Sequence, residues 1–222
     1  FLFLSRFGYL KSTIPDNPSA EKQADVFKEL IDELNVDKII LYANSAGSTS
    51  AFHFAIKYPQ ICKGLILQSA NAPLGYNPGT PPKFIFKSNF LYWFFLKLFG
   101  KMMFSMFVPK SILKQLSKEE KRNLMDEVFF SVLPVTERKK GALFDIFVSN
   151  PSIEEDIPFE RIKTPTLILN AIDDPATKIS GAKTLAENIS SSKLVEFETG
   201  GHLLYNQDEK VKDEIDKFIE NI

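Results

Sequence analysis

Apolar and polar positions alternate along this chain with two different periods. Short apolar runs that indicate buried strands lie at residues 38–42, 65–68, 167–170 and 194–197. Apolar positions at helical spacing predict helices over residues 20–34, 47–58, 179–189 and 207–219. In the first of these helices, the expected buried face consists of Val26, Phe27, Leu30, Ile31 and Leu34. Because strands and helices alternate, the pattern predicts an α/β fold, a mostly parallel sheet with helices on both faces.

The alternation breaks after the second predicted strand. Residues 71–82 are rich in turn-forming residues, and the segments that follow are helix-like without further strands. One of these segments opens with a capping box, in which Ser117 and Glu120 have the required spacing. The pattern therefore predicts a first part of the α/β core, a helical insertion and a second part of the core, at residues 1–71, 72–155 and 156–222.

The most apolar stretch of the insertion spans residues 86–108. Lys97 and Lys101 interrupt it and, being four residues apart, would share one face of a helix, while Gly100 weakens it as a continuous helix. Seven lysines and no acidic residue lie between residues 71 and 118. We expect one or two amphipathic helices that pack on the core and partly line a substrate pocket. Contact with an anionic membrane surface and preference for an anionic substrate are the alternative interpretations.

Charge, cysteine and histidine content bear on the partners, the location and the cofactors of the protein. The formal net charge of -1 speaks against nucleic acid as a partner. Cys62 is the only cysteine, so no disulfide can form within the chain, and we expect a cytoplasmic location. Two histidines far apart and one cysteine do not make a metal-ligand cluster, and we expect neither a metal nor another cofactor.

A candidate nucleophile, Ser45, stands where an apolar strand pattern stops and a helical pattern begins. Small residues flank it at Ala43 and Gly47, as a sharp and crowded strand-to-helix turn requires. Such a turn exposes the serine hydroxyl and leaves the Ala46 N–H near a helix N-terminus, where it can donate to a developing oxyanion. By itself the pentapeptide also fits an ordinary strand end.

A serine nucleophile needs a general base, and the chain offers only His53 and His202. His53 lies two turns along the helix that follows Ser45 and would point away, so we expect it to be structural. His202 follows Gly200 and Gly201 in a loop between the last strand and the last helix, and paired glycines let such a loop turn freely. We therefore assign the base to His202. The alternative is a loop histidine satisfied by a backbone carbonyl.

The third group must be a carboxylate that holds the imidazole in the right tautomer. Asp173 and Asp174 directly follow the buried strand at residues 167–170, and loops just past strand ends carry the chemistry in such sheets. The corresponding position after the strand at residues 65–68 offers no candidate, because residues 72–117 contain no acidic side chain. We assign the role to Asp174, with Asp173 as the alternative. The non-catalytic interpretation of these residues is an Asp-Pro turn whose carboxylates are solvated.

The chain order Ser45, Asp174, His202 resembles the catalytic triad of the α/β-hydrolase superfamily. Residues 5–9, Ser-Arg-Phe-Gly-Tyr, look like the segment that follows strand four of that family. The resemblance covers the chain outside residues 72–155. It implies an α/β-hydrolase fold in which the insertion is a helical cap that roofs the active site.

By the same resemblance, residues 1–4 correspond to strand four, so strands one to three of the family have no counterpart in this sequence. In the family, the loop after strand three supplies a second oxyanion N–H. We therefore expect the sequence to be a fragment, or a gene model cut at its N-terminus.

Together these features predict a serine hydrolase that cleaves a carboxylic ester or related acyl bond of a largely apolar small molecule. Its catalytic residues would be Ser45, Asp174 and His202, with the N–H of Ala46 in the oxyanion hole. A non-catalytic protein of the same fold that binds a ligand or partner, and an inactive fragment, are the alternative interpretations.

Overall fold

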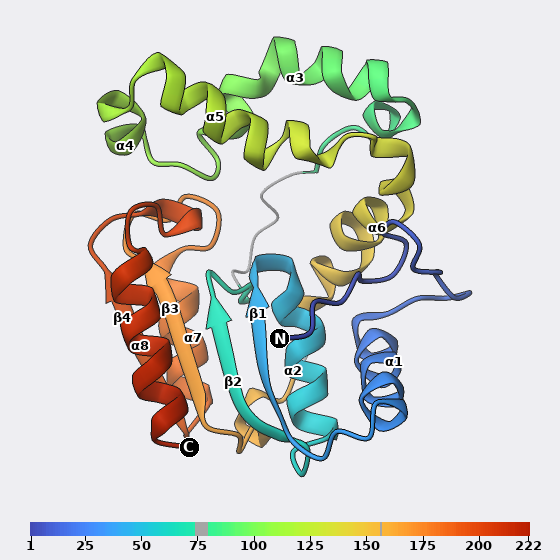
Figure 1. Cartoon of the computed structure of the whole chain (residues 1–222), viewed down its shortest axis with the longest axis vertical. Coiled ribbons are helices and arrows are strands. Elements are labelled where there is room, and N and C mark those ends of the chain that lie inside the picture. Colours follow the sequence, from blue (N-terminus) through green and yellow to red (C-terminus); the bar gives the residue numbers. More distant parts are fainter. Residues whose placement is uncertain (74–79, 156) are drawn as a thin grey trace.

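The centre of the protein is a sheet of parallel strands (Figure 1). The computed structural model describes residues 1–73, 80–155 and 157–222. Within them the sheet has the order β1-β2-β3-β4, and its strands are β1 (Ile39–Asn44), β2 (Cys62–Gln68), β3 (Thr166–Ala171) and β4 (Ser192–Phe197). Every neighbouring pair is parallel. The α/β class predicted from the sequence is confirmed.

Helices cover both faces of this sheet (Figure 1). One face packs against α1 (Ala20–Glu33), α2 (Ser48–Lys57) and α7 (Ile179–Asn188). The other face packs against α8 (Asp208–Glu220). The two faces have separate apolar clusters, so the sheet is the middle layer of three.

The burial of β3 explains why its sequence is continuously apolar. All six of its residues are buried. Ile168 belongs to the cluster on the side of α2 and α7, whereas Leu167 and Leu169 belong to the cluster on the side of α8. Successive side chains of a strand point to opposite faces, so a strand covered on both sides needs apolar residues at every position.

The buried face of α1 agrees only in part with the one predicted. Ile31 is buried and Phe27 packs against the core, whereas Val26, Leu30 and Leu34 are exposed. The buried residues of the helix are Ala20, Gln23, Ala24 and Ile31. Two alanines let α1 approach its neighbours closely, and the Gln23 Oε1 accepts a hydrogen bond from the Phe7 N–H at 2.6 Å. Hydrophobicity therefore predicts part of this face, and small side chains and one polar contact account for the rest.

The prediction of a strand at residues 1–4 is also wrong. These residues have no regular structure, and Phe1, Leu2 and Phe3 are exposed. A strand is stable only when a neighbour satisfies its backbone N–H and C=O groups. In the described residues β1 is an edge strand that pairs with β2, and no strand lies beyond it to accept residues 1–4.

A helical cap separates β2 from β3 in the sequence. Its helices are α3 (Asn89–Phe104), α4 (Lys110–Gln115), α5 (Lys118–Val128) and α6 (Lys139–Phe144). Figure 1 shows the cap beyond the carboxyl ends of the strands, and its apolar side chains form a cluster of their own. The predicted turn-rich stretch includes residues 74–79, and the predicted second core part begins at residue 156; these positions lie outside the described residues.

The predicted capping box is present at the start of α5, with Ser117 and Glu120 in the expected reciprocal contacts. The apolar stretch for which one or two helices were predicted contains a single long helix, α3, which runs unbroken through Gly100. A Cβ at Gly100 would lie 2.7 Å from the Met125 Cε of α5, so this face of α3 is in contact with α5. Among the described residues, no helix combines the length and the apolar character needed to cross a membrane.

Short 3-10 segments and one π segment connect the longer elements. They are η1 (Ser45–Gly47), η2 (Lys83–Lys87), η3 (Phe130–Val132), η4 (Val135–Glu137), η5 (Asp145–Ser149, the π segment), η6 (Pro151–Glu154), η7 (Phe159–Arg161) and η8 (Gly201–Leu203). Two of them, η1 and η8, lie beyond the carboxyl ends of β1 and β4 and contain Ser45 and His202.

Candidate active site

Ser45 lies on a tight turn between β1 and α2. Its φ of +48° is in the left-handed region, which non-glycine residues seldom adopt. The Ser48 Oγ donates to the Ser45 carbonyl oxygen at 2.6 Å and accepts from the Asn71 N–H at 2.9 Å, which ties this turn to the loop after β2. A strained residue that its surroundings hold in place is typical of a functional site.

His202 lies on η8, and its backbone is held from two sides. The paired glycines before it both have positive φ, and a Cβ at Gly201 would lie only 2.3 Å from the Pro109 Cδ. The His202 N–H donates to the Phe107 carbonyl oxygen of the cap at 2.9 Å. Its own carbonyl oxygen accepts from the Ser69 Oγ, beyond β2, at 2.8 Å. The loop can therefore turn sharply, and cap and sheet together fix the position of His202.

Asp174 follows β3, and its side chain is completely shielded from solvent. Its Oδ1 accepts the N–H groups of Ala176 and Thr177 at 2.7 and 3.0 Å. Its Oδ2 accepts the Thr177 hydroxyl at 2.7 Å. These three donors hold the carboxylate in one orientation, with Oδ2 toward His202.

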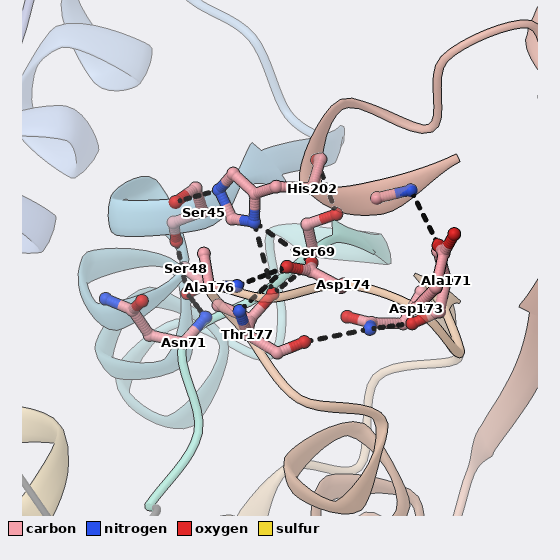
Figure 2. A network of polar contacts seen from close by, with 12 residues as sticks. Ser45, Ser48, Ser69, Asn71, Ala171, Asp173, Asp174, Ala176, Thr177 and His202 are labelled. Atoms are coloured by element: carbon pink, nitrogen blue, oxygen red, sulfur yellow. Dashed lines mark hydrogen bonds and ion pairs between the residues drawn. The ribbon is translucent and has the colours of Figure 1, made fainter. Parts of the chain in front are cut away.

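The three predicted side chains meet in one chain of hydrogen bonds (Figure 2). The His202 Nε2 lies 2.8 Å from the Ser45 Oγ, and the His202 Nδ1 lies 3.0 Å from the Asp174 Oδ2. Because a carboxylate only accepts, Nδ1 must carry the imidazole proton, which leaves Nε2 free to accept from the Ser45 hydroxyl. This arrangement suits removal of a proton from Ser45.

Asp173, the alternative acid, points to the histidine loop rather than to the imidazole (Figure 2). Its Oδ1 accepts from the Gly201 N–H at 2.9 Å, and its Oδ2 accepts from the Thr199 hydroxyl at 2.7 Å. The two neighbouring carboxylates therefore have different surroundings. Asp173 braces the loop that carries His202, and Asp174 contacts the His202 ring.

Sequence reasoning missed several residues that support this site. The Phe107 ring packs edge-on against the His202 imidazole, with centroids 5.4 Å apart. Ser48 and Ser69 fix backbone atoms of Ser45 and His202. Only Thr177 has a local signal, because a side chain three residues after an aspartate commonly shares its turn. The others come from distant parts of the chain, and no spacing rule connects them to the site.

A second polar cluster joins the cap to the Ser45 turn. The Arg6 Nη1 donates to the Ala46 carbonyl oxygen at 2.9 Å, and Arg6 also forms an ion pair with Asp145 at the start of η5. The Tyr9 hydroxyl donates to the same carboxylate oxygen. Burial raises the pKa of Asp145, and the charge of Arg6 opposes that rise. The buried Asp145 carboxylate therefore lies near the Ser45 turn, and Arg6 is its main charged partner.

Replacing Arg6 with methionine should destabilise the protein in a pH-dependent way. A raised pKa means that Asp145 favours the folded state at low pH and that this contribution is lost as the pH rises through the raised value. Without Arg6 the pKa of Asp145 rises further, so the loss with rising pH is larger. We expect the free energy of unfolding to fall by about 3 kcal/mol near neutral pH and by less in mild acid.

Urea unfolding of Arg6→Met at neutral pH and in mild acid measures this difference. Arg138→Met is the matched control, because the Arg138 guanidinium donates to the Pro134 carbonyl oxygen rather than to a carboxylate. Its effect should not change with pH. Equal destabilisation of Arg6→Met at both pH values would contradict the assigned role of the Arg6–Asp145 pair.

The other histidine and the cysteine have structural surroundings. His53 is half-buried on α2, and burial lowers its pKa. Cys62 is buried at the start of β2, and burial raises the pKa of its thiol to about 11. A thiol with so high a pKa is almost entirely protonated at neutral pH and is a poor nucleophile. Ser45 with His202 remains the candidate for nucleophilic chemistry.

A parallel sheet, a serine on a strained strand-to-helix turn, and an acid and a histidine on later strand ends define an α/β protein of the hydrolase type. The family model described as alpha/beta hydrolase fold matches residues 2–209. This chain belongs to the α/β-hydrolase fold family.

Similar proteins include hydrolases from unrelated organisms. The chain is 24% identical over 213 residues to the uncharacterized hydrolase YcgS of Bacillus subtilis (strain 168), which covers 90% of this chain and 74% of that protein. It is 24% identical over 187 residues to the monoglyceride lipase homolog of monkeypox virus, which covers 82% of this chain and 61% of that protein. The esterase EaEST from Exiguobacterium antarcticum superposes with a TM-score of 0.73 at 22% identity, covering 97% and 80% of the two chains. At that identity, the superposition shows a shared fold.

Proposed function

We propose that this protein is a serine hydrolase that cleaves a carboxylic ester or a related acyl bond of a largely apolar small molecule. The observation that carries the proposal is the hydrogen-bond chain from the Ser45 Oγ through His202 to the Asp174 carboxylate, at 2.8 and 3.0 Å. A protein that only binds a ligand has no need for these three groups in this order.

In the proposed reaction, the Ser45 Oγ attacks the carbonyl carbon of the acyl group while the His202 Nε2 takes the hydroxyl proton. The Ala46 N–H donates to the oxyanion that forms. His202 then gives its proton to the leaving alkoxide, and water hydrolyses the acyl-serine with His202 as base. Asp174 stabilises the imidazolium in both halves of the reaction, and it holds the neutral imidazole in the tautomer with its proton on Nδ1.

Two features support an apolar acyl substrate. The Phe107 ring lies directly against His202, and the cap above it has a phenylalanine-rich core. In addition, similar proteins include an esterase and a monoglyceride lipase homolog. The cytoplasmic location remains a prediction from cysteine usage.

Hydrolysis of p-nitrophenyl acetate, butyrate and octanoate tests the proposal. We expect kcat/KM to rise with acyl length, by at most about fourfold for each methylene that becomes fully buried. Equal rates on acetate and octanoate would contradict an apolar pocket. Rates no higher than those of a Ser45→Ala variant on all three esters would contradict the esterase and favour the binding protein.

A further inference from the structure

The outward face of α3 carries a continuous row of large side chains. Spacings of three and four residues bring them onto one side of the helix, opposite the buried row Tyr92, Leu96, Gly100 and Phe104. We call this row the outer stripe, and its members are Phe90, Trp93, Phe94, Lys97, Leu98, Lys101 and Met102. Figure 1 shows α3 at the end of the cap farthest from the sheet.

The apolar members of the outer stripe are exposed to an unusual degree. Phe90 is 66% exposed, Leu98 is 60% exposed and Met102 is 58% exposed. The rings of Phe90 and Phe94 stack with centroids 6.0 Å apart, so the exposed surface is contiguous and not a set of isolated side chains. Contiguous apolar surface of this kind marks a site that meets another surface.

The charged side chains of α3 have one sign. Lys97 and Lys101 belong to the stripe, and residues 71–118 contain seven lysines and no acidic residue, whereas the acidic side chains of the cap begin on α5. The Lys97 Nζ lies 5.6 Å from the centroid of the Trp93 ring and 5.3 Å from that of Phe130. Lysines among exposed aromatic side chains match an anionic surface with an apolar layer beneath it.

The same composition fits a second copy of this chain poorly. The centres of protein–protein interfaces are depleted of lysine, and two outer stripes face to face would bring together four like charges. At a lipid surface, by contrast, lysine side chains can reach the headgroups while the aromatic rings enter the interfacial layer.

The length of α3 decides between crossing a membrane and lying on it. With 16 residues it is about 24 Å long, which is shorter than the hydrocarbon core of a bilayer. In addition, the buried face of α3 packs in the apolar core of the cap. We propose that the outer stripe of α3 docks on the surface of an anionic lipid bilayer, with the helix parallel to that surface.

The chain leads from the end of α3 directly to a contact with the candidate active site. Phe107, three residues after the end of α3, accepts the His202 N–H through its carbonyl oxygen and packs its ring on the imidazole. The helix proposed to dock is therefore continuous in sequence with the segment of the cap that contacts the candidate base. The docking itself does not depend on the proposed function, because binding can be measured without any turnover.

Trp93 supplies a direct readout, because it is the only tryptophan in the chain. We expect its emission to shift to shorter wavelength and to become protected from iodide when vesicles of phosphatidylcholine with phosphatidylglycerol are added. High salt should reverse the shift, and vesicles of phosphatidylcholine alone should give a much weaker one.

Lys97→Glu/Lys101→Glu should weaken partition into the anionic vesicles at least about thirtyfold, because each lysine near such a surface contributes roughly a factor of five. Lys212→Glu/Lys217→Glu on α8 is the matched control with the same change in charge, and it should bind like the wild type. Circular dichroism checks that both variants are folded. Phe94→Ser/Leu98→Ser should also lose binding, because it removes the apolar contact.

Several results would overturn the proposal. One is a folded protein whose Trp93 emission does not respond to anionic vesicles, and another is equal loss of binding in the α8 control. Binding that ignores both lipid charge and salt would contradict the anionic surface. A blue shift that depends on protein concentration without lipid would show that a second copy covers the stripe. Vesicle binding without ester hydrolysis would contradict only the proposed function.

Discussion

Replacing Ser45 with alanine is expected to lower kcat for ester hydrolysis by a factor of about 10⁴ or more, with an unchanged fold. This corresponds to a rise of about 5 kcal/mol in the activation barrier. The reason is that the Ser45 Oγ is the atom that would form the acyl-enzyme, and His202 has no other hydroxyl within reach at Nε2 in the described site. Steady-state kinetics on a p-nitrophenyl ester measures the loss.

Ser48→Ala is the matched control for Ser45→Ala. It removes a hydroxyl three residues away that only holds the Ser45 turn and the Asn71 N–H. We expect a loss of no more than about tenfold in kcat and about 1 kcal/mol in the free energy of unfolding. A Ser45→Ala variant that keeps activity within tenfold of the wild type would contradict a nucleophilic role for Ser45.

Asp174→Asn should lower kcat by about 10⁴-fold while the protein stays folded. The Oδ1 of the new amide can still accept the N–H groups of Ala176 and Thr177. Its NH₂ group then faces the His202 Nδ1 and donates to it, which moves the imidazole proton to Nε2. In that tautomer the ring presents N–H to the Ser45 Oγ and cannot take its proton.

Asp173→Asn makes the same chemical change one residue earlier and should cost less than about tenfold in kcat. Its oxygens hold the Gly201 N–H and the Thr199 hydroxyl, and an asparagine can keep both contacts. Comparing the two variants under one set of conditions distinguishes the acid from its neighbour. A larger loss in Asp173→Asn than in Asp174→Asn would reverse the assignment.

The sequence was most informative where chemistry and secondary structure coincide. Ser45 could be found because a strand pattern ends at small residues, and the structure has it at φ +48° on such a turn. Asp174 and His202 could be found because each follows an apolar strand and few other candidates exist. Their roles remain proposals, but their meeting within hydrogen-bond distance was predictable from these positions.

Contacts between distant segments were not predictable. The sequence gives no sign that the Phe107 carbonyl oxygen of the cap would hold the His202 N–H, or that Arg6 would bridge Ala46 and Asp145. These contacts depend on where the cap lies over the strand ends. That position follows from packing of whole elements and not from any local pattern of residues.

The errors in the prediction have physical causes that local patterns also miss. Residues 1–4 have a strand-like composition but no neighbouring strand to satisfy their backbone. In α1 the predicted residues Val26, Leu30 and Leu34 are exposed, while Gln23 is buried because it accepts a hydrogen bond from the Phe7 N–H. In each case tertiary contacts, or their absence, outweigh the intrinsic preference of the residues.

The central claim is that Ser45 is an activated nucleophile, and covalent labelling tests it most directly. The protein is treated with a fluorophosphonate, digested with trypsin and analysed by mass spectrometry. The adduct is predicted on the peptide of residues 39–57, and fragmentation should assign it to Ser45 and not to Ser48 or Ser50. Replacing His202 with alanine should abolish the labelling. A folded protein that takes up no label, or takes it up at another residue, would contradict the account.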